Sequence, residues 1–517
     1  MSPSLPREPG VEHSSTSAVI LTLNSYPCCS RDNCSALCYN GHGFPGDRGK
    51  HTTYLWMLMQ QKVGVIEQIR PVEETTARVS LRQVLDLALP AVGEQMLNMM
   101  VGLVDTFLVG HLGASSLAAV GLANQIVMLA TTFFAAVATG TTALVARHVG
   151  AKEPATANRI MHQSLTVGLV LALPLILICF FGATLSMQVM GAQDDVVGLG
   201  SMYMQIVAPT LLTSALMFIG NAALRGSGDT RTPMQVMAVV NGVNIVVAYT
   251  LINGLGPFPA LGVAGSAMGA ALGRTTGCVM VLLILFKGKA ALRLNLTDLR
   301  LDRVQLARIV NVGVPAGMEL LVMRLGMTIF AATVASLGTA AYAAHQVVMT
   351  SESLSFQPGF GFGVAAATLM GQGLGAKDPR RAEDGGLTAV RLAVLVMSGM
   401  GVLFFLFPGW FMGVFTSDPE VIALGITPLR IIAIAQPFLA LTMVLSGALR
   451  GAGDTRGPLV VTTIGIWCVR LPLAFILLRL TSIGLPGAWI TMIVDQFVRS
   501  MFFIGRFRSG RWKRIRV

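Results

Sequence analysis

The feature that most constrains this chain is a series of twelve apolar stretches, each long enough to cross the hydrocarbon core of a bilayer as a helix. Their expected bounds, good to a few residues, are 84–110, 116–146, 160–182, 197–222, 233–253, 262–286, 310–335, 340–370, 386–408, 420–447, 458–480 and 486–507. The sequence therefore predicts an all-α polytopic membrane protein with twelve transmembrane helices.

Composition agrees with this prediction. The chain is 53% hydrophobic and only 12% charged, whereas charged residues make up about a quarter of a soluble globular protein. A net charge of +12 raises the question of nucleic acid, but the Lys and Arg residues fall between the apolar stretches. We therefore expect a lipid bilayer and no nucleic acid as the surroundings of this chain.

The basic residues also predict the topology. Connections after the even-numbered stretches carry Arg147, Lys152 and Arg159; Arg225 and Arg231; Lys287, Lys289, Arg293, Arg300, Arg303 and Arg308; Lys377, Arg380 and Arg381; Arg450 and Arg456; and the residues from Arg506 to Arg516. Connections after the odd-numbered stretches carry almost none. Because cytoplasmic loops are enriched in Lys and Arg, we expect a multi-pass protein of the plasma (inner) membrane with both termini in the cytoplasm.

Residues 1–78 have a different character: they are polar, rich in Pro, Gly and Ser, and without sustained periodicity. Such a segment buries too little apolar surface to offset its ordering entropy, so we expect a disordered tail. Its cysteines, Cys28, Cys29, Cys34 and Cys38, lack the paired C-x-x-C spacing of a zinc site. We therefore expect no metal site.

An internal repeat divides the chain. Residues 223–234 recur at 448–459 with nine identities in twelve, and the same offset of 225 relates 150–154 to 375–379. Six stretches per repeat is an even number, so both halves enter the membrane from the same side. The repeat predicts two parallel six-helix lobes around a central cleft, at 84–290 and 310–507, with a cytoplasmic linker at 291–309 and a basic tail at 508–517.

The repeated turns themselves suit helix boundaries. Their glycines fit a helix carboxyl end, and Asp229 and Asp454 can cap the helix that follows. Arg225 and Arg450 could pair with these aspartates or with lipid phosphates. We favour this structural interpretation of the cytoplasmic turns over direct contact with a substrate.

Four segments of the sequence together resemble the multidrug and toxic compound extrusion (MATE) family. They are Leu-Val-Asp-Thr-Phe-Leu-Val-Gly at 103–110, Leu-Ala-Ala-Val-Gly-Leu-Ala at 117–123, and the two Leu-Arg-Gly-x-Gly-Asp-Thr-Arg turns. The resemblance implies an antiporter rather than an enzyme, which uses a proton or sodium gradient to export small organic, often cationic, compounds. We expect a monomer with no cofactor other than the coupling ion.

One polar stripe lies within the first stretch. An ionisable side chain inside a membrane span is a functional candidate by default, and Asp105 is the leading case. Asn98 and Glu94 lie seven and eleven residues before it, so at about 100° per residue the three share one face of the helix. We expect that face to line the cavity of the amino-terminal lobe.

Asp105 also matches the cation-coupling aspartate of the DinF-like branch of this family. The resemblance implies that Pro90 is the point of helix bending and that Asn241 and Asn244, on the fifth helix, belong to the same cavity. The branch has a second acid on that helix, where this chain has Ala248. Asp105 is therefore expected to lack a neighbouring like charge.

The NorM-like branch instead implies carboxylates on the seventh and tenth helices. Glu319 lies on the seventh stretch, near its cytoplasmic end, and the tenth offers Arg430 and Gln436 but no acid. Phe330 and Met323 occupy the repeat positions of Asp105 and Asn98. The sequence thus favours the DinF-like branch and leaves the choice between H⁺ and Na⁺ open.

Other polar groups within the stretches are Glu352, Gln357, Asp495, Arg499 and His345. Asp495 and Arg499 are four residues apart and are expected to pair on one helix, and His345 is expected to be structural. No cluster typical of an enzyme is apparent.

One rival hypothesis is a flippase for a lipid-linked precursor or polysaccharide. Its cleft would need several cationic residues to bind a pyrophosphate. Arg324, Arg430 and Arg470 are the candidates that the sequence offers.

Overall fold

The computed structural model describes residues 79–255, 257, 259–295, 302–480 and 483–515. The expected tail at 1–78 and its four cysteines lie outside these residues. All regular elements described are helical, apart from an isolated bridge between Lys289 and Leu292.

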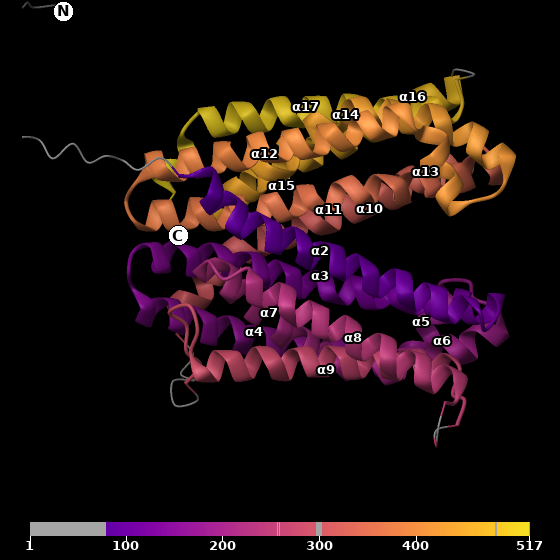
Figure 1. Cartoon of the computed structure of the whole chain (residues 1–517), viewed down its shortest axis with the longest axis horizontal. Helices are drawn as coiled ribbons and strands as arrows, with labels where there is room; N and C mark the ends of the chain where they lie inside the picture. The colour runs from indigo at the N-terminus through magenta and orange to yellow at the C-terminus, as the bar shows by residue number, and fades with distance from the viewer. Residues whose placement is uncertain (1–78, 256, 258, 296–301, 481–482, 516–517) are drawn as a thin grey trace, which may run out of the picture. The chain divides into compact units, whose positions relative to one another are not determined.

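Two groups of helices follow the two halves of the sequence (Figure 1). The first comprises α2 (Leu81–Gly110), α3 (Ala114–Gly150), α4 (Pro154–Phe181), the short α5 (Ala183–Val189), α6 (Asp194–Val207), α7 (Thr210–Ser227), α8 (Arg231–Asn253) and α9 (Val263–Lys287). The second comprises α10 (Arg303–Ala335), α11 (Thr339–Gly375), α12 (Pro379–Leu406), the short α13 (Pro408–Phe415), α14 (Pro419–Gly451), α15 (Arg456–Thr463), the π-helical turn η2 (Ile464–Arg470), α16 (Leu471–Leu480), α17 (Leu485–Arg508) and the 3₁₀ turn η3 (Arg511–Arg514).

These helices account for the predicted spans. Among the described residues ten helices are long and apolar enough to cross a membrane, and the bent pair α6 and α7, which meet at 53°, would make eleven. The remaining predicted span is α11, which has 37 residues but does not reach the mean hydropathy of the other ten over a membrane-spanning length. The fold is the predicted all-helical one, and its arrangement agrees with twelve helices in two lobes.

Three helices begin earlier than predicted: α4 at Pro154 and not at 160, α10 at Arg303 and not at 310, and α12 at Pro379 and not at 386. Helix α10 begins early because Asp302 accepts hydrogen bonds from the backbone N–H groups of Val304 and Gln305 and so caps the helix there. The expected linker is correspondingly shorter.

The first helix of each half crosses between the lobes. Val84 and Ala88, early in α2, belong to an apolar core formed mainly by α11, α12 and α14, whereas Val109, near its end, packs with α3 and α6. Helix α10 does the same in reverse. Ile309, near its start, packs in a core of the first half, and Phe330, further along, packs in a core of the second half. Each lobe in space therefore includes the first turns of the other half's leading helix.

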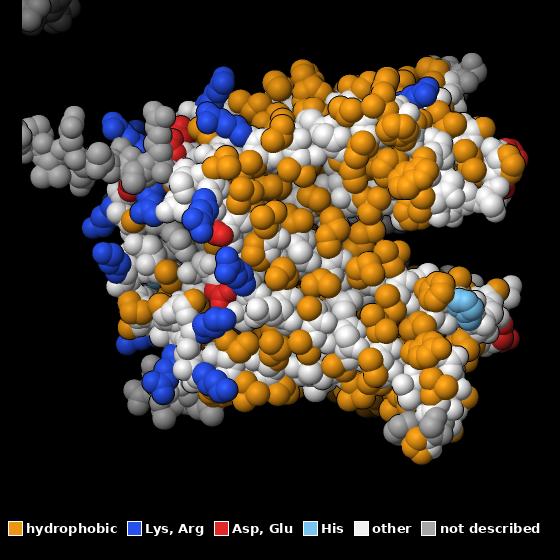
Figure 2. Space-filling view, in the orientation of Figure 1, with side chains coloured by type: hydrophobic (Ala, Val, Ile, Leu, Met, Phe, Trp, Pro, Cys, Tyr) orange, Lys and Arg blue, Asp and Glu red, His pale blue; other side chains and the backbone are white. Residues whose placement is uncertain are grey.

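The two ends of the helix bundle differ in character. Lys and Arg side chains gather at one end, here called the basic end, and a hollow separates the two helix groups at the opposite end (Figure 2). At the basic end the carboxyl ends of α3 and α11 touch: a Cβ at Gly150 would overlap the carbonyl of Gln372, and a Cβ at Gly375 would overlap the carbonyl of Arg147. These contacts, called the glycine crossing below, are related by the offset of 225.

Candidate functional site

Asp105 lies in a polar site inside the amino-terminal lobe. Its carboxylate is buried, at 5% exposure, and accepts a hydrogen bond from Asn244 on α8, with 2.9 Å between Nδ2 and Oδ1. Asn241, one turn earlier, donates instead to the backbone carbonyls of Leu97 and Met237. The two asparagines therefore differ in role: Asn244 contacts the carboxylate, and Asn241 fastens α8 to α2.

The other two members of the predicted stripe do not contact Asp105. Asn98 is partly buried, and no hydrogen bond joins it to Asp105 within the described part of the chain. Ala248 is fully buried against Gly269 of α9. The position at which the DinF-like branch has its second acid is thus filled by apolar packing.

Three further polar residues surround this site and were missed by the sequence reasoning. The Tyr203 hydroxyl donates to Asn124 over 3.4 Å, and the charge of Arg274, on α9, acts on both Asp105 and Tyr203. Arg274 Nη1 is buried and has no hydrogen-bond partner among the described residues. Arg274 was detectable, because it is a charged residue within a predicted span.

Glu94 was expected to line the cavity, and the structure gives its carboxylate a partner that the sequence did not predict. Its carboxylate is 3% exposed and accepts a hydrogen bond of 2.6 Å from Nη1 of Arg225, at the end of α7. A buried carboxylate requires a counter-charge, and Arg225 supplies one. Glu94 therefore ties α2 to α7 near the basic end.

Glu319 makes the equivalent tie in the second half. Arg450 donates to both of its oxygens, over 2.8 and 3.1 Å, and Thr462 adds a bond of 3.0 Å. Both members of this pair lie 225 residues after Glu94 and Arg225. The arginines thus pair with the glutamates of the leading helices and not with the aspartates of their own turns.

The turn aspartates perform the predicted capping. Asp229 accepts from the backbone and hydroxyl of Thr232, over 3.0 and 2.6 Å, and lies 3.4 Å from Lys289. Burial alone would raise the pKa of Asp229, but the bonds from Thr232 and the charge of Lys289 outweigh it and hold the pKa below its ordinary value. Asp454 likewise accepts from the backbone of Gly457 and pairs with Arg506 at 2.8 Å.

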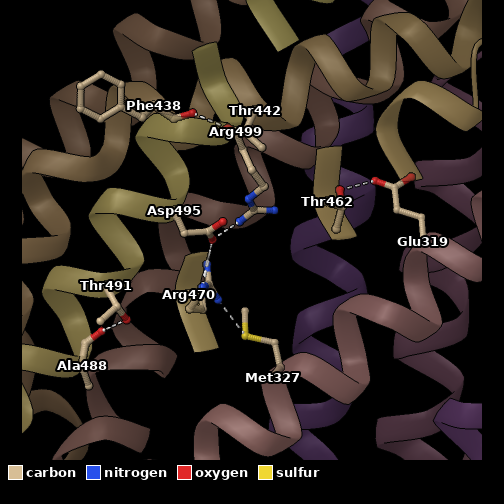
Figure 3. A network of polar contacts seen from close by, with 10 residues as sticks. All are labelled: Glu319, Met327, Phe438, Thr442, Thr462, Arg470, Ala488, Thr491, Asp495 and Arg499. Atoms are coloured by element: carbon tan, nitrogen blue, oxygen red, sulfur yellow. Dashed lines mark hydrogen bonds and ion pairs between the residues drawn. The ribbon is translucent and has the colours of Figure 1, made fainter. Parts of the chain in front are cut away.

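A second polar cluster occupies the carboxyl-terminal lobe (Figure 3). The predicted pair of Asp495 and Arg499 is present, at 2.8 Å, and Arg470 joins it from η2, with Nη2 2.6 Å from the same carboxylate oxygen. Sequence spacing could not place Arg470 here, because it lies on a different helix. His345 packs between the rings of Phe330 and Trp489, as a structural residue would.

No group of three or more His, Cys, Asp or Glu side chains within the described ranges could hold a metal ion. The polar chemistry of these residues is that of single carboxylates with amide or guanidinium partners. Such groups can bind a proton or a small cation.

Comparison with known proteins agrees with this architecture. The MatE family model matches twice, at residues 90–250 and 315–476, once in each half. The chain is 33% identical over 440 residues to the "Probable multidrug resistance protein NorM" of Thermotoga maritima, covering 84% of this chain and 93% of that protein. It is 29% identical over 429 residues to the "Uncharacterized transporter YisQ" of Bacillus subtilis, covering 82% and 94%.

Solved structures share the fold. A MOP superfamily transporter from Pyrococcus furiosus superposes with a TM-score of 0.79 at 24% identity, covering 86% of this chain and all of that one. A structure described as MATE in the bent conformation superposes with a TM-score of 0.78 at 24% identity, covering 84% and 97%. The chain therefore belongs to the MatE family of multidrug efflux transporters, which are membrane proteins and not enzymes.

Proposed function

We propose that this protein is a secondary antiporter that exports small organic, often cationic, compounds in exchange for H⁺ or Na⁺, with Asp105 as its coupling residue. The observation that carries the proposal is the buried bond between Asp105 and Asn244, on two different helices of one lobe. A carboxylate kept inside a membrane is costly and marks a functional site. Its family membership supplies the class of activity.

Antiport requires a site whose affinity for the substrate falls when it takes up the cation. Neutralising Asp105 weakens its bond to Asn244 and alters the charge of the cavity. Pro90, four turns earlier on α2, has no N–H to complete the helix ladder and gives the helix a place to bend. Because α2 crosses between the lobes, a bend at Pro90 would move the lobes relative to each other and produce alternating access.

The distribution of charge supports an orientation. The basic end would face the cytoplasm, with both termini on that side of the plasma (inner) membrane, because cytoplasmic loops carry the Lys and Arg residues. The hollow at the opposite end (Figure 2) would then open to the outside. The glycine crossing would close the cytoplasmic side of this outward-open monomer, whose partners are the lipid bilayer and its organic substrates.

The ion pairs of the acids on the leading helices support a DinF-like over a NorM-like mechanism. Glu319, the seventh-helix acid, is already paired with Arg450 and Thr462. A flippase is disfavoured, because Arg470 is fully buried against Asp495 and Arg430 is exposed over the ring of Phe405, at 5.8 Å.

Purified protein in liposomes tests the proposal. We would measure uptake of ethidium, driven separately by a proton gradient and by a sodium gradient, for the wild type, Asp105→Asn, and the surface control Asp384→Asn. We expect one gradient to drive transport in the wild type and the control and neither to do so in Asp105→Asn. Undiminished transport by Asp105→Asn would contradict the proposed role of Asp105.

A further inference from the structure

The polar cluster of the carboxyl-terminal lobe is sealed from solvent. Arg470 and Asp495 are fully buried and Arg499 is 6% exposed. Both arginines donate to Oδ2 of Asp495, Arg470 through Nε over 3.0 Å and Arg499 through Nη2 over 2.8 Å (Figure 3). Arg470 also donates to the sulfur of Met327 and lies over the ring of Phe330.

The charges of this cluster do not balance. Two guanidinium groups share one carboxylate, which leaves one positive charge in a span where isolated charges are costly. The nearby acid of α10, Glu319, is already paired with Arg450. His345 packs among aromatic rings and supplies no negative charge.

Among the described residues, Glu352 on α11 is a further buried acid that the charge of this cluster reaches. It is 5% exposed, and the charge of Arg470 acts on it. Within the described ranges no hydrogen bond or ion pair holds its carboxyl group. Ionised, Glu352 cancels the extra positive charge of the arginines; neutral, it leaves that charge uncompensated.

A glycine in the carboxyl-terminal lobe leaves the space that the charged side chains of the cluster occupy. Gly465 lies in the π-helical turn η2, where a Cβ would overlap both Asp495 Oδ1 and Arg499 Cγ. Its repeat position in the amino-terminal lobe is Val240, which packs against Gly273 and Gly277 of α9. The charged cluster thus stands where the other lobe has close apolar packing, and π-helical turns often occur at functional sites.

We propose that Glu352 is a second proton-binding site of this transporter, in the carboxyl-terminal lobe, with Arg470 and Arg499 as its fixed counter-charges. This inference rests on the proposed antiport. Uptake of one proton converts the Glu352 carboxylate to its neutral acid and leaves the cluster with a net positive charge. That charge opposes an organic cation in the cleft, so proton binding and substrate binding exclude each other.

The site suits a proton better than a sodium ion. A hard metal cation takes several oxygen ligands at once, whereas a proton needs only the carboxylate of Glu352. Arg470 would repel a metal ion beside Glu352, whereas protonation adds no separate cation to the site. The ion that Glu352 binds is therefore H⁺.

Infrared difference spectroscopy tests the inference without transport. We would record spectra of the purified full chain at acidic and alkaline pH and follow the carbonyl band of a buried, protonated carboxyl group. The wild type and the surface control Glu383→Gln should both show the band. Glu352→Gln should lose the Glu352 component, and Glu352→Asp should shift it. An unchanged band in both Glu352 variants overturns the proposal, as does a band that responds to sodium and not to pH.

A second measurement connects the site to the substrate. Addition of tetraphenylphosphonium to weakly buffered wild-type protein should release protons, detected with pyranine. Glu352→Gln should release fewer protons, Asp105→Asn should also release fewer, and the double variant should release none. Full release by Glu352→Gln overturns the second site. If the wild type neither transports nor releases protons while the pH-dependent band persists, the proposed antiport fails and Glu352 remains a proton site.

Discussion

The two lobes are alike at the basic end and different in the middle of their helices. Glu94 with Arg225, and Glu319 with Arg450, make the same tie at an offset of 225. Further along the same leading helices, Asp105 bonds an asparagine in one lobe, whereas its counterpart Phe330 lies beneath Arg470 in the other. The ties fasten crossing helices and so serve both lobes equally, whereas the mid-helix positions are where the lobes acquired different chemistry.

The largest effect should come from removing the carboxylate of Asp105, which the other lobe lacks at its counterpart, Phe330. We expect Asp105→Asn to abolish efflux, because an amide keeps the size and bonding of the carboxylate but cannot cycle a charge. Glu319→Gln should reduce efflux less, per folded molecule. Ethidium efflux from cells with matched membrane levels of each variant measures both. If Asp105→Asn retained wild-type efflux while Glu319→Gln lost it, the coupling site would lie in the carboxyl-terminal lobe.

The next largest effect concerns the two ties. Removing one partner of a buried ion pair costs about 3–5 kcal/mol, and we expect Glu94→Gln and Glu319→Gln each to lose roughly the lower end of that range, because both arginines keep some contact with solvent. Thermal unfolding in detergent, with Glu383→Gln as the surface control, measures the loss. Strongly unequal losses would show that the repeated ties are not equivalent.

Sequence reasoning located the spans and the repeat and placed Asp105 and Asn244 in one site, because these follow from apolar length, self-similarity and one matched motif. It did not find the partner of Glu94, since helical periodicity identifies a shared face of one helix but not the residue opposite it. Arg225 lies on another helix, 131 residues away from Glu94, and spacing along one helix cannot identify such a partner. The partnership of Arg470 with Asp495 was out of reach for the same reason.

A third prediction concerns the glycine crossing between α3 and α11. Gly150→Leu or Gly375→Leu would force a side chain into a backbone carbonyl of the other lobe. Overpacking of this kind costs about 1–3 kcal/mol, and 1.4 kcal/mol alters the ratio of closed to open basic ends about tenfold. Either variant should therefore shift the protein toward an open basic end.

Spin labels at two exposed, repeat-related positions would detect this opening. In a cysteine-free background, Arg159→Cys and Asp384→Cys report the separation of the lobes at the basic end by electron paramagnetic resonance. Gly399→Leu, at a glycine with open space around it, is the control. If the distance distribution of Gly150→Leu matched that of the control, the crossing would not hold the basic end closed.

The smallest predicted effect involves the residues that follow the crossing. Lys152 and Lys377, again 225 apart, adopt φ values of 60° and 58°, in the left-handed region that follows many helix ends and usually holds glycine. An L-residue there costs roughly 1–2 kcal/mol, while glycine forfeits about 0.5–1 kcal/mol through the freedom of the unfolded chain. Lys152→Gly and Lys377→Gly should each therefore raise the free energy of unfolding by about 0.5–1 kcal/mol.

Lys152→Ala, which removes the charge but keeps the strain, should give no gain. Because the two sites are separate turns, the gains should add in the double variant, and a gain at only one of them would mean that the lobes differ at the basic end as well.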